Sequence, residues 1–507
     1  MHLSEELVIL YSIIAVALIL LVFSFLSFAF RRSPSVSQPQ DKRRPKEKRK
    51  EKGKKEKKKE KRSEKEKEKE RKKDKKKKEH RSQSQNIVTV CNAEITSTQG
   101  HLRQTQSSQI WREAGIYERN YHPQDLPARQ ITHLLYAFVN LGADGTVFRE
   151  SLRRWLYGTS PVEESFPWLT SVVLAEAEAG SNAYGCVEQL YRLKRANRTM
   201  KVMLSIGGWN WSGNFAAAAG TAATRANFAR TSVQLMKDWG FDGIDIDWEY
   251  PSDDLEASNL ILLLQAVRDE LDLYAQNWAN GHHFPLTIAG AASPQRYGQL
   301  RLAELGGIVD YVFLMAYDYV VPSSSMAGGG ATGHNANLYA NPGNAMSTPF
   351  NTDTAVRAYI EAGFPAKKIV IGMPLYGRSF RGTDGMGMPY GAVGSGHWEE
   401  GVLDYKDLPE PGARNMYFDE VARASYVYDE NLREIVSFDC PMAVEAKVGY
   451  LREQGLGGAM FWEASGDRVG SHSLISTSHR ALGSLESTEN WLDYPDSSYQ
   501  NIAAGLM

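Results

Sequence analysis

FDGIDIDWEYP, residues 241–251, carries four acidic side chains within eight positions. Side chains of a β-strand alternate between its two faces, so Asp245, Asp247 and Glu249 would share one face. Ile244 and Ile246, which lie between the acids, would share the opposite face and could be buried. Because packing three like charges together is unfavourable, this row predicts a proton-transfer site.

Strand-like and helical patterns alternate from about residue 109 to the end of the chain. This alternation is typical of a parallel α/β fold, and seven visible strands with one less distinct strand predict a TIM (β/α)8 barrel. The predicted strands cover residues 131–139, 201–206, 243–249, 286–290, 311–317, 369–373 and 458–462. The predicted helices include residues 186–196, 223–239, 257–274, 353–362 and 443–453. Active-site residues of such barrels lie at the carboxyl ends of strands, where Glu249, Tyr317 and Trp462 fall.

The first 108 residues have a different composition. Residues 7–30 form a run of 24 residues without a charge, and a helix of that length spans about 36 Å, enough to cross a bilayer. We therefore expect a transmembrane anchor over residues 1–30, with a cleaved secretory signal as the alternative. Residues 31–108 predict a disordered charged linker, because residues 54–81 are nearly all Lys and Glu and cannot form a core. An exposed helix with Glu–Lys pairs is the alternative for that segment.

The net charge of −1 hides a strong division along the chain. Residues 41–81 hold 26 Lys and Arg against 11 Asp and Glu, whereas from Ser82 onward 31 basic residues face 47 acidic ones. An acidic body argues against a nucleic-acid partner and suits a neutral sugar polymer. The chain has three cysteines, Cys91, Cys186 and Cys440. This small and odd number argues against a disulfide framework.

Five motifs follow one another along the chain: Ser205-Ile-Gly-Gly-Trp209, Asp242 to Glu249, Met315-Ala-Tyr-Asp318, Pro374-Leu-Tyr-Gly-Arg378 and Gly457-Gly-Ala-Met-Phe-Trp-Glu463. In this order they resemble the motifs of family 18 glycoside hydrolases, and specifically of the fungal-type chitinases. The resemblance covers about residues 115–505. It implies that residues 379–438 are the small α+β insertion of the chitinase subgroup, within a catalytic domain over 109–507.

The resemblance implies a retaining mechanism in which the acetamido group of the substrate attacks the anomeric carbon. Glu249 would protonate the glycosidic oxygen, and Asp247 would orient the acetamido group. Asp245 would share a proton with Asp247, since adjacent carboxyl groups do not all ionise easily. Tyr317 would hydrogen-bond the acetamido oxygen from the other side. No cofactor and no metal are expected.

A second set of residues would bind the sugar chain. Trp462 would form the apolar floor under the reacting sugar, and Trp209 would be either an exposed sugar platform or loop packing. Tyr376 and Arg378 would bind sugar or anchor the insertion. The candidate substrate-binding residues are Trp462, Met315, Asp318, Tyr376, Arg378, Phe138 and Trp209.

Several other features have a structural interpretation. Asp242 faces away from the acidic row and would serve the turn that enters the strand. The family's first strand would lie near Ile110-Trp111 and would steady Asp245 through a hydrogen bond. Asn210-Trp-Ser212 fits the N-glycosylation sequon, a pattern that is common by chance.

These residues predict a monomeric chitinase that cleaves β-1,4 bonds between N-acetylglucosamine units, with chitin or chitooligosaccharides as its partner. A non-catalytic chitin-binding lectin of the same fold is the alternative, as is a glycosidase acting on N-glycan cores or peptidoglycan. Such lectins usually lack the proton donor, whereas Glu249 is present. Because chitin is assembled outside the cytoplasm, we expect a membrane-anchored protein with an extracellular catalytic domain, or else a secreted one.

Overall fold

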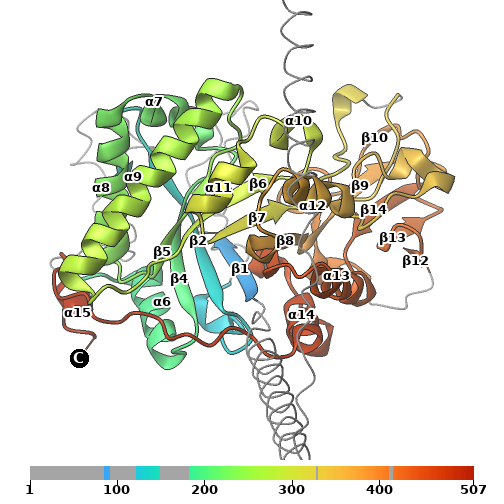
Figure 1. Cartoon of the computed structure of the whole chain (residues 1–507). Coiled ribbons are helices and arrows are strands. Elements are labelled where there is room, and N and C mark those ends of the chain that lie inside the picture. Colours follow the sequence, from blue (N-terminus) through green and yellow to red (C-terminus); the bar gives the residue numbers. More distant parts are fainter. Residues whose placement is uncertain (1–84, 92–120, 149–181, 327–328, 410–414, 507) are drawn as a thin grey trace, which may run out of the picture. The chain divides into compact units, whose positions relative to one another are not determined.

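Parallel strands lie at the centre of the fold (Figure 1), and the pairings of eight of them form a closed ring. The computed structural model describes residues 85–91, 121–148, 182–326, 329–409 and 415–506. The ring runs through β1 (Gln85–Cys91), β2 (His133–Leu141), β4 (Lys201–Gly207), β5 (Gly243–Asp247), β6 (Leu286–Ala291), β7 (Tyr311–Met315), β8 (Ile369–Pro374) and β15 (Gly458–Trp462). β15 pairs with β1, and β1 pairs with β2, so the ring closes. The predicted α/β fold with eight parallel strands is therefore confirmed.

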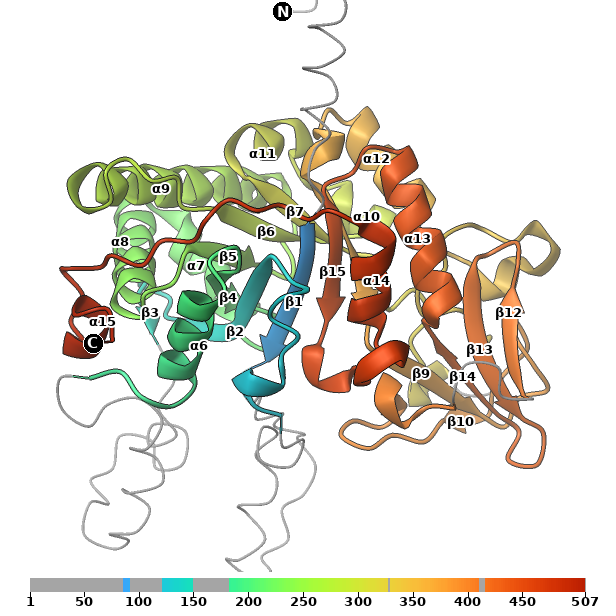
Figure 2. The same cartoon turned by 90° about the horizontal axis from the view of Figure 1, so that it is seen from below.

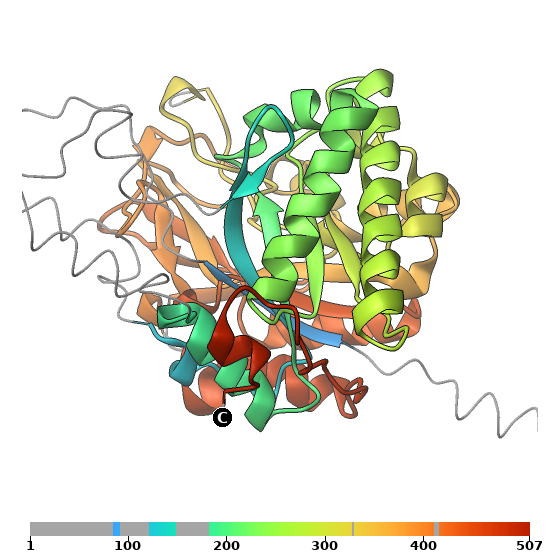
Figure 3. The same ribbon diagram turned by 90° about the vertical axis from the view of Figure 1, so that its left-hand side faces the viewer.

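Helices cover the outside of the ring, and α8 and α9 lie side by side along it (Figure 3). Side chains cap the starts of these two helices, since Thr221 accepts a hydrogen bond from the Thr224 amide and Asp253 accepts one from the Glu256 amide. The helices are α6 (Gly185–Ala196), α7 (Phe215–Gly220), α8 (Ala222–Asp238), α9 (Asp254–Trp278), α10 (Pro294–Tyr297), α11 (Leu302–Ile308), α12 (Thr352–Glu361), α13 (Pro441–Glu453), α14 (Leu474–Leu482) and α15 (Gln500–Ala503). The five helices expected from the sequence are all present, with ends within four residues of the predicted ones.

Buried side chains form two main layers on the two faces of the strands. Ile244 and Ile246 of β5 belong to the large cluster between strands and helices, as their alternation predicts. The interior of the ring holds a separate cluster, on which Tyr317 and Trp462 pack. Its buried members are Leu135, Met203, Phe313, Val370 and Met460. Both aromatic residues follow or end strands of the ring, so this cluster supports the floor of the carboxyl end of the barrel.

A second sheet follows β8 and lies to one side of the barrel (Figure 2). Its strands are β9 (Tyr376–Arg381), β10 (Ala392–Val393), β11 (Val402–Asp404), β12 (Met416–Asp419), β13 (Ala424–Asp429) and β14 (Glu434–Phe438), and all their pairings are antiparallel. The second sheet begins at Tyr376, which is three residues before the predicted start of the insertion at residue 379. Its expected helical part is, among the described residues, only the 3-10 turn Tyr405–Asp407.

The first strand of the ring is not where the sequence analysis placed it. β1 fills the position between β15 and β2, whereas the prediction put this strand near residues 110–111. β1 also falls within residues 31–108, so the linker prediction does not hold for its seven residues. The run Ile87-Val-Thr-Val90 has high β-propensity, which explains why it pairs despite its charged neighbour segment.

The predicted membrane anchor and the rest of the charged linker lie outside the described residues. The sequence analysis places the start of the α/β domain at residue 109. In the structure it starts earlier, because β1 belongs to the ring. Among the described helices, none is both long and apolar enough to cross a membrane.

Candidate active site

Asp245 and Asp247 lie at the carboxyl end of β5, inside the ring. Asp245 is buried, and its two carboxylate oxygens accept hydrogen bonds from Ser205 of β4 and Thr287 of β6, both at 2.7 Å. Burial raises the pKa of Asp245 to about 6, although these two hydrogen bonds lower it. The two hydrogen bonds therefore hold Asp245 in one orientation, while burial favours its protonated form more than water would.

Glu249 lies two residues beyond the end of β5, on the segment that leaves the strand. The predicted strand over 243–249 is thus two residues too long. The Glu249 amide donates a hydrogen bond of 2.8 Å to the Ser212 hydroxyl. Burial, then the charge of Glu249 and a hydrogen bond with it, raise the pKa of the Tyr250 hydroxyl well above its ordinary value. Tyr250 therefore stays protonated and can donate to the Glu249 carboxylate.

Tyr317 follows β7 and reaches the acidic row from another side of the ring. Burial raises the pKa of its hydroxyl well above the ordinary value, and the nearby charges of Asp247 and Glu249 raise it further. The rings of Tyr317 and Tyr376 meet edge to face, with centroids 6.3 Å apart. Tyr317 is therefore a protonated hydrogen-bond donor beside two of the three acids.

Asp318 and Arg378 form a bidentate ion pair that joins the barrel to the second sheet. The guanidinium donates to the two Asp318 carboxylate oxygens at 2.7 and 2.8 Å, and a third nitrogen lies 3.6 Å from Glu399. Asp318 has a φ of +59°, and its amide donates to the buried Asn335 side chain at 3.0 Å. The guanidinium also lies over the Tyr376 ring, 5.3 Å from its centroid. Arg378 of β9 thus links the segment after β7 to the second sheet.

Trp462 and Phe138 stack on each other next to the ring interior, with centroids 5.5 Å apart and planes 28° apart. Gly208 makes this stack possible, because a β-carbon there would lie 2.5 Å from the Phe138 ring. Gly208 also has a φ of +79°, which favours glycine. Met315, at the end of β7, is half-buried. These residues give the site an apolar side opposite the carboxyl groups.

Trp209 occupies the loop after β4 and is 70% exposed. So large an exposure argues against loop packing as the role of this ring, and it leaves the ring accessible to a sugar. Within the described part of the chain, no three His, Cys, Asp or Glu side chains gather in a way that could hold a metal ion. His283 instead pairs with Asp310 at 2.8 Å on the surface.

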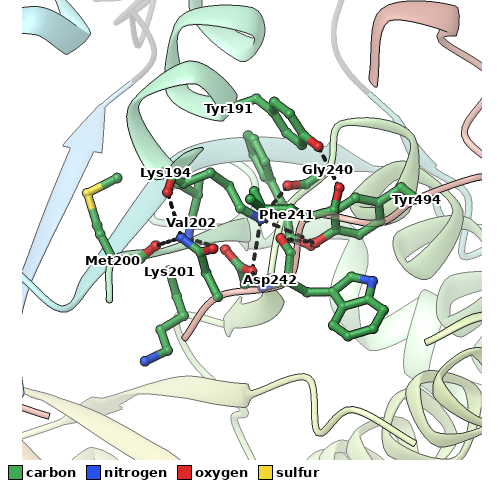
Figure 4. Close-up of polar contacts among 12 residues, drawn as sticks. Tyr191, Lys194, Met200, Lys201, Val202, Gly240, Phe241, Asp242 and Tyr494 are labelled. Atoms are coloured by element: carbon green, nitrogen blue, oxygen red, sulfur yellow. Dashed lines mark hydrogen bonds and ion pairs between the residues drawn. The ribbon is translucent and has the colours of Figure 1, made fainter. Parts of the chain in front are cut away.

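Asp242 has a different role from the one expected at the strand entrance. Its carboxylate is fully buried, forms an ion pair of 2.8 Å with Lys194 of α6, and accepts hydrogen bonds of 2.8 Å from the amides of Val202 and Trp491. Figure 4 shows this network, in which the Lys194 ammonium also donates to the Gly240 carbonyl at 2.7 Å. Asp242 therefore ties β4, α6 and the carboxyl-terminal segment together at the end of β5 opposite to Glu249.

The sequence analysis assigned no role in the site to four residues that the structure places there: Thr287, Ser212, Asn335 and Tyr250. Thr287 pairs with Asp245 in the register of β5 and β6, so a strand alignment could have found it. Ser212 and Asn335 lie in loops, and the sequence carries no signal for their contacts.

The sequence also matches a known family of proteins. The profile for glycosyl hydrolases family 18 matches residues 107–467, which includes all the acids of the site. The chain belongs to glycosyl hydrolase family 18. The resemblance noted in the motifs is thus confirmed, and the protein is a glycoside hydrolase.

Two relatives of this family 18 protein cover most of its length. Chitinase 1 of Aphanocladium album is 55% identical over 396 residues, covering 77% of this chain and 89% of that protein. Endochitinase 1 of Metarhizium robertsii is 53% identical over 419 residues, covering 82% of this chain and 94% of that protein. Among solved structures, chitinase ChiA74 from Bacillus thuringiensis is 27% identical with a TM-score of 0.62, covering 79% of this chain and 70% of that one.

Proposed function

We propose that this family 18 hydrolase cleaves the β-1,4 linkages between N-acetylglucosamine units of chitin by a retaining, substrate-assisted mechanism. The observation that carries the proposal is the gathering of Asp245, Asp247, Glu249 and Tyr317 at one end of the barrel. The names of the two fungal relatives, a chitinase and an endochitinase, support the same substrate.

In this proposal Glu249 protonates the glycosidic oxygen as the bond to the leaving sugar breaks. The acetamido carbonyl of the reacting sugar attacks the anomeric carbon and forms an oxazolinium ion. Asp247 orients the acetamido N–H and balances the developing positive charge, and the protonated Tyr317 donates to the acetamido oxygen. The raised pKa of Asp245, about 6, supports a proton shared with Asp247. In the second step, Glu249 accepts a proton from the water molecule that hydrolyses the oxazolinium ion.

The binding roles follow from the same geometry. We assign the floor under the reacting sugar to Trp462, braced by Phe138, because their stack supports a flat apolar surface. Met315 and Tyr376 would complete the walls near Tyr317. Asp318 and Arg378 would present polar atoms to the next sugar while they hold each other in place.

The mechanism predicts that the first product has the same anomeric configuration as the substrate. Proton NMR of chitin hexamer during the first minutes of hydrolysis should show the β-anomer before mutarotation. A fully deacetylated hexamer, which lacks the attacking carbonyl, serves as the control and should remain intact. Initial appearance of the α-anomer would rule out participation of the acetamido group, and absence of any hydrolysis would favour the lectin alternative.

We also propose that the catalytic part acts outside the cell, anchored by residues 1–30 or released after their removal. The apolar run over 7–30 and the location of chitin support this proposal. Protease added to intact cells should digest the catalytic part if it is anchored outside, with a cytoplasmic protein as the protected control. Protection of the catalytic part in intact cells, without any in the medium, would place it inside.

A further inference from the structure

The buried hydroxyl of Ser212 lies where three backbone groups of the site converge. Ser212 begins a 3-10 turn after β4 and is 8% exposed. Its Oγ lies 2.9 Å from the Gly208 carbonyl, 3.2 Å from the Asp247 carbonyl and 2.8 Å from the Glu249 amide. A hydroxyl can accept from the amide and donate its one proton to a carbonyl, so the site uses both of its capacities.

This hydroxyl continues the pairing of β4 and β5 beyond the point where the strands end. The paired register between them ends at Gly207 and Asp247, and one further hydrogen bond joins the Gly208 amide to the Asp247 carbonyl at 2.8 Å. Glu249 lies past this last bond, and its amide is held by the Ser212 side chain. The backbone position of Glu249 therefore depends on a side chain from a loop 37 residues away in the sequence.

We propose that Ser212 is a positioning residue, which sets the direction in which Glu249 delivers its proton to the glycosidic oxygen. The inference rests on the proposed role of Glu249 as the general acid. Ser212 itself need not touch the substrate. Removing its hydroxyl would leave the Glu249 amide without this partner and allow the carboxyl group to shift, and misplacement by about 1 Å can reduce a rate about 100-fold.

Ser212→Ala tests the proposal when two substrates that differ in their leaving group are compared. A natural chitin oligomer needs its leaving oxygen protonated, whereas a 2,4-dinitrophenyl glycoside of chitobiose leaves as a stable anion and needs little help from an acid. We expect kcat/KM to fall about 10- to 100-fold on the oligomer and less than about threefold on the dinitrophenyl glycoside. The ratio of the two values does not depend on how much of the variant is folded, so partial misfolding does not obscure the result.

Two further variants complete the test. Ser212→Thr keeps the hydroxyl and should restore most of the activity on the oligomer, with KM close to that of the wild type. Glu249→Gln should show the same dependence on the leaving group as Ser212→Ala, but more strongly. Expression in a host without N-glycosylation keeps the loss of the Asn210-Trp-Ser212 sequon from adding a second effect.

The outcomes separate the inference from the function on which it rests. Equal losses of Ser212→Ala on both substrates, or no loss on either, would overturn the positioning role. If Glu249→Gln itself showed no dependence on the leaving group, the proposed role of Glu249 would fail instead. A dependence seen for Glu249→Gln but absent for Ser212→Ala would leave the chitinase proposal intact and reject only this inference.

Discussion

Replacing Glu249 with Gln should abolish nearly all turnover of chitin oligomers while leaving their binding close to normal. The change removes the proton that must reach the glycosidic oxygen but keeps the size of the side chain. General acid catalysis contributes about 10²- to 10⁴-fold to such a step, so kcat should fall at least by that factor. Steady-state kinetics on chitin hexamer and calorimetric titration with the same oligomer measure the two quantities separately.

Glu304→Gln is the matched control for this experiment. It makes the same chemical change on α11, where the side chain is 54% exposed and pairs only loosely with Arg301 at 3.5 Å. Its kcat should equal that of the wild type. Near-normal turnover in Glu249→Gln would refute the assignment of Glu249 as proton donor. Loss of binding together with turnover would show that Glu249 holds the substrate rather than protonates it.

The row of acids is the part of the site that local sequence predicts best. Alternation along one strand is enough to place Ile244 and Ile246 among the buried residues on one face and Asp245 on the other. Most of the motifs lie at strand ends, and parallel strands bring those ends to one side of a barrel. Tyr317 and Trp462 could be placed near the acids for this reason, although each comes from a different part of the chain.

Contacts made by loops and by distant segments could not be predicted in the same way. Trp491 bonds to Asp242 across 249 residues, and nothing in the local pattern of either partner indicates the other. The bond of Thr287 to Asp245 across 42 residues follows only once the register of β5 and β6 is known. β1 was missed for a different reason. Its short β-branched run follows a long charged segment, so composition over a wide window outweighed a local strand signal.

The buried ion pair between Lys194 and Asp242 should be a sensitive point for stability. Both side chains are fully buried, and burial lowers the pKa of Lys194 to about 8 even though Asp242 raises it. Lys194→Met keeps an unbranched side chain only one atom shorter but leaves the Asp242 carboxylate buried without its counter-ion. Such a change costs about 3–5 kcal/mol of unfolding free energy. Urea unfolding followed by tryptophan fluorescence measures it.

Arg192→Ala supplies the comparison on the same helix. Arg192 of α6 pairs with Glu188 at 2.6 Å, but its side chain is 59% exposed, and exposed pairs four residues apart contribute only about 0.3–0.5 kcal/mol. We therefore expect the two variants of α6 to differ several-fold in their effect on stability. A loss for Lys194→Met no larger than that for Arg192→Ala would contradict the structural role of the pair.

The double variant Lys194→Met with Asp242→Asn separates the unpaired charge from other losses. Neutralising Asp242 removes the buried charge, so the double variant should be more stable than Lys194→Met alone by about 1–3 kcal/mol. Recovery should be incomplete, because an amide oxygen cannot replace both carboxylate oxygens that accept from Val202 and Trp491. Folded Lys194→Met should keep the kcat of the wild type, since the pair lies at the end of β5 opposite to Glu249. Purely additive losses would show that Lys194 and Asp242 act independently, despite the 2.8 Å between their charged atoms.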